Sequence, residues 1–223
     1  MSGPLLLSLR VTLAALAVVA PAGVALGWWL ARGRGWARAV VDALVVLPMV
    51  LPPSVLGYYL LLVFGRRGPV GAVLAEAFGV RLVFTAAGAA LAAAVVAFPL
   101  MAKGAEAAFA RVERELEEVA RANGLGPWRV FREVTLPLAA PGLAVAATLA
   151  GVRALGEFGA TLVFAGYAPG ATDTAPLEIF MALQGGDDAR AGRLVLALTA
   201  LSGASTAALA WWARRDRSGG ERP

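Results

Sequence analysis

The feature that most constrains this chain is a series of five apolar stretches, each close to the length of a membrane span. A bilayer core is roughly 30 Å thick, so a helix needs about 20 mostly apolar residues to cross it. The stretches cover residues 5–30, 40–64, 82–101, 138–158 and 194–212, and shorter charged segments separate them. The pattern predicts an all-α, polytopic membrane bundle of five transmembrane helices, formed by residues 1–223 as a single domain.

Composition supports a membrane protein and excludes several kinds of chemistry. Of the 223 residues, 59% are hydrophobic and only 16% are charged, whereas an ordinary soluble domain has about 25% charged residues. The chain has no cysteine and no histidine, which removes disulfides, thiolate chemistry, most metal sites and the usual general base. We therefore expect membrane lipid around the chain, no catalytic residues, and no cofactor or metal bound by it.

Prolines interrupt the first two stretches. Pro21 lies between two alanines, as in a signal-peptide cleavage site, but the stretch lacks a basic beginning and is too long for a signal peptide. A retained helix with a kink at Pro21 is therefore favoured. In the second stretch, Pro48, Pro52 and Pro53 must interrupt helical hydrogen bonding. It forms either one kinked helix or a short interfacial helix followed by a span, and two spans there would give six helices.

Arginine and lysine are distributed unevenly between the loops. With five spans, thirteen of them fall in the segments 31–39, 103–135 and 213–223, and six fall on the other side. Because positively charged loops stay in the cytoplasm, we expect the N-terminus outside and the central loop and C-terminus inside, in a multi-pass protein of the plasma (inner) membrane. Membrane orientation also accounts for the net charge of +5, so no nucleic-acid partner is expected.

The central charged loop, about residues 104–137, has the pattern of two helices joined by a tight turn. Its first part mixes Ala, Glu, Arg and Leu with both charge signs, which favours a solvent-exposed helix. Asn123 and Gly124 end that helix, with Gly124 in the left-handed conformation of a C-cap. Pro127 suits the first turn of a second, short helix, which Leu136 and Pro137 are expected to end.

The second short helix carries an aromatic face beside a basic one. Trp128 and Phe131 are three residues apart and share one face, while Arg129 and Arg132 share the neighbouring face. Trp and Arg commonly provide the binding hot spots of interfaces, so this helix can insert into a groove of a partner. The alternative is a solvated helix whose aromatic side chains fold back onto the membrane interface, and the residues leave both open.

The spacing in this loop resembles a known motif. Residues 118–137 contain E-V-A, three residues, G, nine residues, V, one residue and L-P. This is similar to the EAA loop of ABC importer permeases, E-A-A, three residues, G, nine residues, I, one residue and L-P, with mild departures at Val119 and Val134. The resemblance implies a type I ABC importer permease fold, in which the loop forms the coupling helix that docks into a cleft on a cytoplasmic ATPase. The candidate coupling residues are Glu118, Ala120, Gly124, Trp128, Arg129, Phe131, Leu136 and Pro137.

Three further segments resemble one branch of these transporters. RALGEFGATLVFAG at 153–166, TAPLEIFMALQGGD at 174–187 and LPPSVLGYYLLLVFGRRGPVG at 51–71 are similar to molybdate permeases. The resemblance implies a doubly charged tetrahedral oxyanion as substrate, molybdate or tungstate, delivered to the outer loops by an extracytoplasmic binding protein. Sulfate permeases have a similar first segment, so a sulfate-type permease is the alternative.

The fourth apolar stretch contains a candidate translocation site. Arg153 and Glu157 are four apart on one expected helix, and an ion pair inside a membrane marks function by default. They either line the translocation path at a dimer interface or only neutralise each other. Small residues after them permit close helix approach or a narrow pore wall, while Phe158 and Phe164 are either hydrophobic gate residues or ordinary packing. The candidate pathway residues are Arg153, Glu157, Phe158, Gly159 and Thr161.

The chain has no energy source of its own. A phosphate-binding P-loop needs Gly-Lys followed by Ser or Thr, and the only lysine, Lys103, is followed by Gly104. ATP and Mg are therefore expected on a separate ATPase. One coupling loop serves one ATPase, which predicts a homodimer facing an ATPase dimer, with the path on the two-fold axis. The alternatives from other classes are an ATP-independent channel or membrane scaffold and, less favoured without His or Cys, a membrane enzyme.

Overall fold

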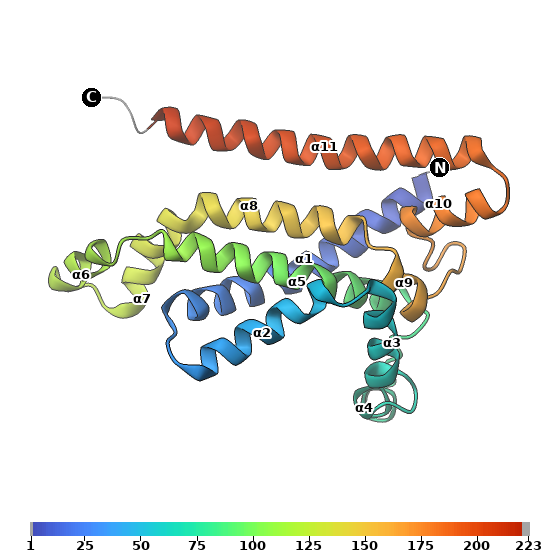
Figure 1. Ribbon diagram of the computed structural model, residues 1–223, viewed down its shortest axis with the longest axis horizontal. Coiled ribbons are helices and arrows are strands. Elements are labelled where there is room, and N and C mark those ends of the chain that lie inside the picture. Colours follow the sequence, from blue (N-terminus) through green and yellow to red (C-terminus); the bar gives the residue numbers. More distant parts are fainter. Residues whose placement is uncertain (1, 220–223) are drawn as a thin grey trace.

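The computed structural model describes residues 2–219, and this part of the chain is helical, without strands (Figure 1). Four helical segments within it are long and apolar enough to cross a membrane, namely Gly3–Arg32, Ala86–Ala110, Pro127–Leu155 and Asp188–Trp211. A fifth candidate is the pair Trp36–Val50 and Pro53–Phe64, which is bent by 115°. The predicted all-α membrane bundle is thus confirmed, with the predicted five spans if the bent pair is one span and four if it is not. The alternative of six spans does not hold for the described residues, because each half of the pair is too short.

Prolines cause the break between α2 (Trp36–Val50) and α3 (Pro53–Phe64). A residue that precedes proline is driven out of the helical conformation by the proline ring. Leu51 precedes Pro52 and Pro52 precedes Pro53, and both have extended ψ angles, 140° and 138°. The predicted interruption is therefore confirmed at these two prolines, whereas Pro48 lies inside α2 without ending it.

Close packing of small residues joins α1 (Ser2–Arg32), α5 (Ala86–Ala110) and α8 (Leu136–Leu155) into the core. Gly23 and Gly27 of α1 are four apart and face α5 so closely that a Cβ on Gly23 would collide with the Met101 side chain, and a Cβ on Gly27 with the α5 backbone. On the other side of α5, Gly104 meets Ala146 of α8 in the same way. Small residues let helix backbones approach in a membrane, where association depends on van der Waals packing. The central helix is therefore α5.

The two ends of the bundle carry different elements (Figure 1). One end holds α6 (Arg114–Ala122) and α7 (Pro127–Val130), together with the C-terminal end of α1 and the beginning of α2. The other end holds α3, α4 (Pro69–Phe78), α9 (Gly159–Phe164) and α10 (Ala175–Gln184), and α11 (Asp188–Gly219) starts there. The segments with most of the positive charge thus gather at the α6 end, in agreement with the grouping predicted from the loops.

A wide helical turn connects the short helix α7 to the long helix α8. Residues Phe131–Thr135 form a π-helical turn, and the Leu136 N–H bonds to the Phe131 carbonyl, five residues back. The expectation that Leu136 and Pro137 end the short helix is wrong, because the chain stays helical from Pro127 to Leu155. Pro137 has no N–H to donate to the preceding turn, and local π adjustments can satisfy the backbone groups that a proline frees in a membrane helix.

Candidate coupling segment and translocation residues

The turn that was predicted between two helices of the central loop is present. Gly124 has a φ of +85°, the left-handed region in which glycine is favoured, and Asn123 donates its side-chain N–H to the Val119 carbonyl at 2.8 Å. Pro127 is at the start of α7. One detail differs from the prediction, because the helical stretch before Asn123 is two helices. The membrane helix α5 continues to Ala110, and α6 begins at Arg114.

The residues of the EAA-like motif lie mostly on the outer surface of α6. Glu118 is exposed, Val119 is 60% exposed and Ala120 is half-buried. Leu116 on the same helix is also exposed. A short helix that presents two aliphatic side chains outward can lie in a hydrophobic groove of another protein.

Glu117, beside the motif, is the strongest polar centre of this segment and was not predicted from the sequence. Its carboxylate is paired with Arg32 at the end of α1, accepts a hydrogen bond from the Thr135 hydroxyl at 2.6 Å, and lies 3.3 Å from Arg121 of its own helix. The side chain is only 5% exposed. The sequence offered no signal to distinguish it from Glu118, because only the tertiary structure brings Arg32 and Thr135 to it.

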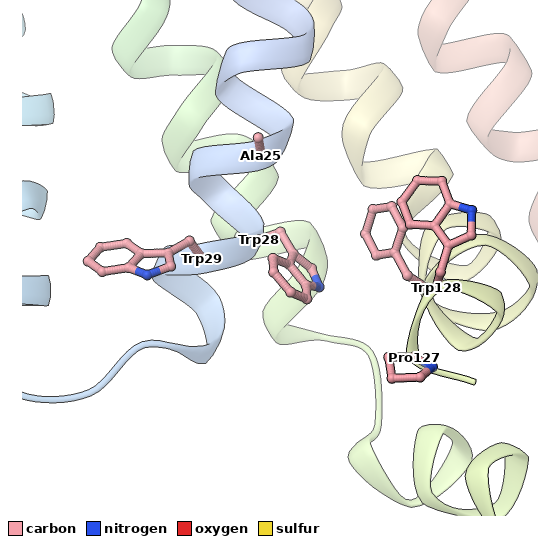
Figure 2. Close-up of a pocket in the computed structure, with 6 residues that line it drawn as sticks. Ala25, Trp28, Trp29, Pro127 and Trp128 are labelled. Atoms are coloured by element: carbon pink, nitrogen blue, oxygen red, sulfur yellow. The ribbon is translucent and has the colours of Figure 1, made fainter. Parts of the chain in front are cut away.

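The two aromatic side chains predicted to share one face differ in burial, because Phe131 packs against the bundle and Trp128 is exposed. Phe131 folds back, with its ring centroid 5.7 Å from that of Trp28 on α1 and 6.2 Å from that of Phe109 on α5. Trp128 stacks on Phe131 at 5.7 Å and remains 69% exposed. An apolar groove of about 610 Å³ lies between α1 and α7 (Figure 2). It is lined by Ala25, Trp28, Trp29, Pro127, Trp128 and Phe131.

A second group of charges holds α2 against α5 at the same end. The Lys103 ammonium lies 2.7 Å from Asp42 of α2 and also contacts Glu106 of its own helix. Glu106 in turn accepts a hydrogen bond of 2.6 Å from Arg38. This role of Lys103 was not predicted, because its partner on α2 is 61 residues away along the chain.

Arg153 and Glu157 form the predicted ion pair, but not on one helix. The Arg153 Nη1 lies 2.8 Å from the Glu157 Oε2, whereas α8 ends at Leu155 and Glu157 follows in the turn before α9. The expectation that both belong to one span is therefore wrong. Glu157 is 2% exposed at its side chain, Arg153 is 34% exposed, and the Glu157 Oε1 accepts the Ala160 N–H at 2.8 Å. Glu157 thus caps α9 as well as pairing with Arg153.

The other candidate pathway residues surround α9, which packs against α3. The Phe158 ring centroid is 5.0 Å from that of Phe180 on α10, and Gly159 lies close against Pro53 of α3. Thr161 is 1% exposed. Phe164 is fully buried beside Phe64, so it packs inside the chain's own fold, which was the alternative to a gate role.

A family model described as "Binding-protein-dependent transport system inner membrane component" matches residues 23–215, and the chain belongs to this family. It is 43% identical over 217 residues to the molybdenum transport system permease protein ModB of Escherichia coli (strain K12), covering 96% of this chain and 95% of that protein. It is 38% identical over 199 residues to the putative molybdenum transport system permease protein YvgM of Bacillus subtilis (strain 168), covering 89% and 88%.

Solved structures agree with the fold. The inward-facing MetNI methionine ABC transporter matches with a TM-score of 0.71 and 21% identity, covering 95% of this chain and 94% of that one. Family and fold together confirm the predicted ABC importer permease architecture and the multi-pass inner-membrane location. They also confirm a transport component in place of an enzyme, and binding-protein-dependent transport implies an ATPase and a binding protein as partners.

Proposed function

We propose that this chain forms the translocation pathway of an ATP-driven importer for a tetrahedral oxyanion, molybdate or tungstate. The observation that carries the proposal is the separate, exposed helix α6, which bears the EAA-like residues at the end of the bundle where the positive charge gathers. The molybdenum permeases that are similar over almost the whole chain supply the substrate class. The α6 end is then cytoplasmic, and the end with α3, α4, α9 and α10 receives the binding protein.

ATP and Mg bind to the separate ATPase in this proposal, and α6 with α7 is the contact with it. Glu118, Val119 and Trp128 are exposed and enter the ATPase cleft, while Phe131 holds α7 against α1 and α5. Each chain provides one such segment. Two copies of this chain therefore face two ATPase subunits, with the pathway between the copies.

The Arg153–Glu157 pair sets the affinity along the pathway. Arg153 is one-third exposed and attracts an oxyanion, and Glu157, buried next to it, reduces the net positive charge. Conduction requires binding that is favourable enough for entry and weak enough for release, which a partly neutralised arginine provides. Phe158 and Gly159, which are half-buried, form the adjoining wall, and Thr161 packs behind it because it is buried.

Transport by the reconstituted complex tests this function. The chain is placed in proteoliposomes with its matching ATPase and binding protein, and ATP hydrolysis and anion uptake are measured with molybdate, tungstate and sulfate in turn. We expect stimulation by molybdate and tungstate only. Stimulation by sulfate would change the substrate and keep the mechanism, whereas anion flux through the chain without ATP would support a channel.

Variants of the central loop test the coupling assignment. Gly124→Val forces a β-branched residue into a φ of +85°, which such residues rarely adopt, and Trp128→Ala removes the exposed aromatic side chain. Both should abolish ATP-driven uptake in well-expressed protein. Trp36→Ala removes a tryptophan that is 81% exposed at the same end but lies outside the loop, and it should leave uptake unchanged. If Gly124→Val and Trp128→Ala also retain ATPase association and uptake, the assignment is wrong.

A further inference from the structure

We propose that Glu117 is the positioning residue that fastens the coupling helix α6 to the membrane helices, so that movement of α6 reaches α1 and α8 together. The inference rests on the proposed function and adds to it a link inside the permease. The residues that resemble the EAA motif face outward, whereas Glu117 faces inward, to the bundle. The link consists of Glu117, Arg32 and Thr135.

Burial shows why a charged residue must fasten this helix. Within the part of the chain that the structure describes, α6 has a single buried residue, and it is Glu117. Helices in globular proteins normally attach through an apolar stripe, but Leu116 and Val119 of α6 are 44% and 60% exposed. Apolar packing therefore contributes little to the position of α6, and the contacts of one carboxylate contribute most.

The partners of that carboxylate come from different elements. Arg32 is in the last turn of α1, and its guanidinium also lies over the Trp28 ring, 5.4 Å from the centroid. Thr135 is the last residue of the π turn that leads into α8, it is 1% exposed, and its hydroxyl lies 2.6 Å from the Glu117 Oε1. Bonds in which one partner is ionised are the strong ones. One side chain of α6 thus holds two transmembrane helices.

The helix that follows Thr135 leads directly to the candidate pathway. α8 extends 20 residues from Leu136 to Leu155, about 30 Å at 1.5 Å per residue, and Arg153 is in its last turn. A displacement of α6 is carried through Thr135 to the start of this helix and through Arg32 to the end of α1. The π turn lies at the point of attachment, and π turns inside helices are frequent at functional sites.

The threonine allows the link to be cut without changing charge or shape. Thr135→Val replaces the hydroxyl with a methyl group and removes the bond to Glu117, while Thr135→Ser keeps it. Glu117→Gln removes the ion pair with Arg32. Glu113→Gln is the matched control, because Glu113 directly precedes α6, is exposed, and makes no ion pair within the described part of the chain.

The decisive measurement is the number of anions transported per ATP hydrolysed, in proteoliposomes containing equal amounts of assembled transporter. Thr135→Val and Glu117→Gln should lower this ratio several-fold, with ATP hydrolysis continuing, whereas Thr135→Ser and Glu113→Gln should keep it. A purely structural role would lower the amount of assembled complex and leave the ratio unchanged. Hydrogen exchange of the purified protein adds a local readout, with the amides of α6 exchanging roughly 10-fold or more faster in Thr135→Val.

The outcomes separate this link from the function on which it rests. If the unaltered chain shows no ATP-driven uptake with its partners, the proposed function fails. If the unaltered chain does show ATP-driven uptake, and Thr135→Val keeps the same number of anions transported per ATP and the same protection of the α6 amides as Thr135→Ser, the link is refuted and the function stands. Should Glu117→Gln fail to assemble, the comparison between Thr135→Val and Thr135→Ser still decides the question.

Discussion

Gly27→Ala is the smallest change that tests the packing of the core. The added Cβ would lie 2.5 Å from the Ala105 Cβ, 2.7 Å from the Glu106 nitrogen and 2.8 Å from the Ala102 oxygen, whereas ordinary contact begins at 3.4 Å. Two of these three atoms belong to the backbone of α5 and cannot rotate away. The variant therefore has to move α1 away from α5 by about 0.6–0.9 Å.

The loss of stability in Gly27→Ala follows from that displacement. Forcing extra atoms into a well-packed core costs about 1–3 kcal/mol, and the interface that must open is the one between α1 and the central helix. For a chain of this size, 1 kcal/mol shifts Tm by roughly 2–4 °C. We therefore expect Gly27→Ala to lower Tm by roughly 2–12 °C.

Thermal unfolding of the purified protein in detergent, followed by tryptophan fluorescence, measures this shift. Gly203→Ala is the matched control, because it makes the same change inside α11 with nothing within 4 Å of the new Cβ. An alanine there gains up to about 1 kcal/mol from reduced backbone freedom, so its Tm should stay the same or rise. If Gly27→Ala is as stable as Gly203→Ala, the close approach of α1 to α5 does not hold the bundle together.

Two further predictions concern polar groups at the end of the bundle that holds α9 and α10. The hydrogen bond to Glu178 and, second, burial raise the pKa of Tyr167 to about 12. This bond therefore stabilises the fold below pH 10, and its contribution is lost as the pH rises from 10 through 12. An absorbance titration of tyrosinate should lose its step near pH 12 in Tyr167→Phe, and a step that persists would contradict the assignment. Arg153→Ala leaves the buried Glu157 carboxylate without its cation, which should cost about 3 kcal/mol, at the lower end for a buried pair because Arg153 is partly exposed. Adding Glu157→Gln should recover most of the lost Tm, and equal losses in the single and double variants would mean that the unpaired carboxylate does not cause the loss.

Local signals in the sequence predicted the helices and the coupling turn well. The apolar runs located the helices long enough to span, the prolines at 52 and 53 located the break between α2 and α3, and Gly124 predicted a left-handed turn. These features depend on residues close together in the chain. The bend of 115° could not be predicted in the same way, because the contacts of α3 with α9 fix its direction.

The errors at the candidate site have tertiary causes. Periodicity placed Arg153 and Glu157 on one helix, but Gly156 ends α8 and Glu157 instead accepts the Ala160 N–H at the start of α9. Leu136-Pro137 was expected to stop a helix, and a π turn accommodated the proline instead. Glu117 and Glu118 are equivalent in a one-dimensional pattern, and the partner of Glu117 lies 85 residues away. The resemblance to a motif therefore identified the outward face of α6 and not the residue that attaches it.

Burial differs between the core helices, which pack against one another, and α11, which needs other molecules to cover it. In the most apolar 18-residue window of α5, 56% of the residues are buried, against 6% in the corresponding window of α11. Leu196 and Val195 of α11 are 72% and 44% exposed. A long helix with this much exposed apolar surface is stable only against lipid or another chain. Because the α1–α5–α8 core already packs without α11, changes on the outer face of α11 should affect association within the membrane more than the fold of the protomer.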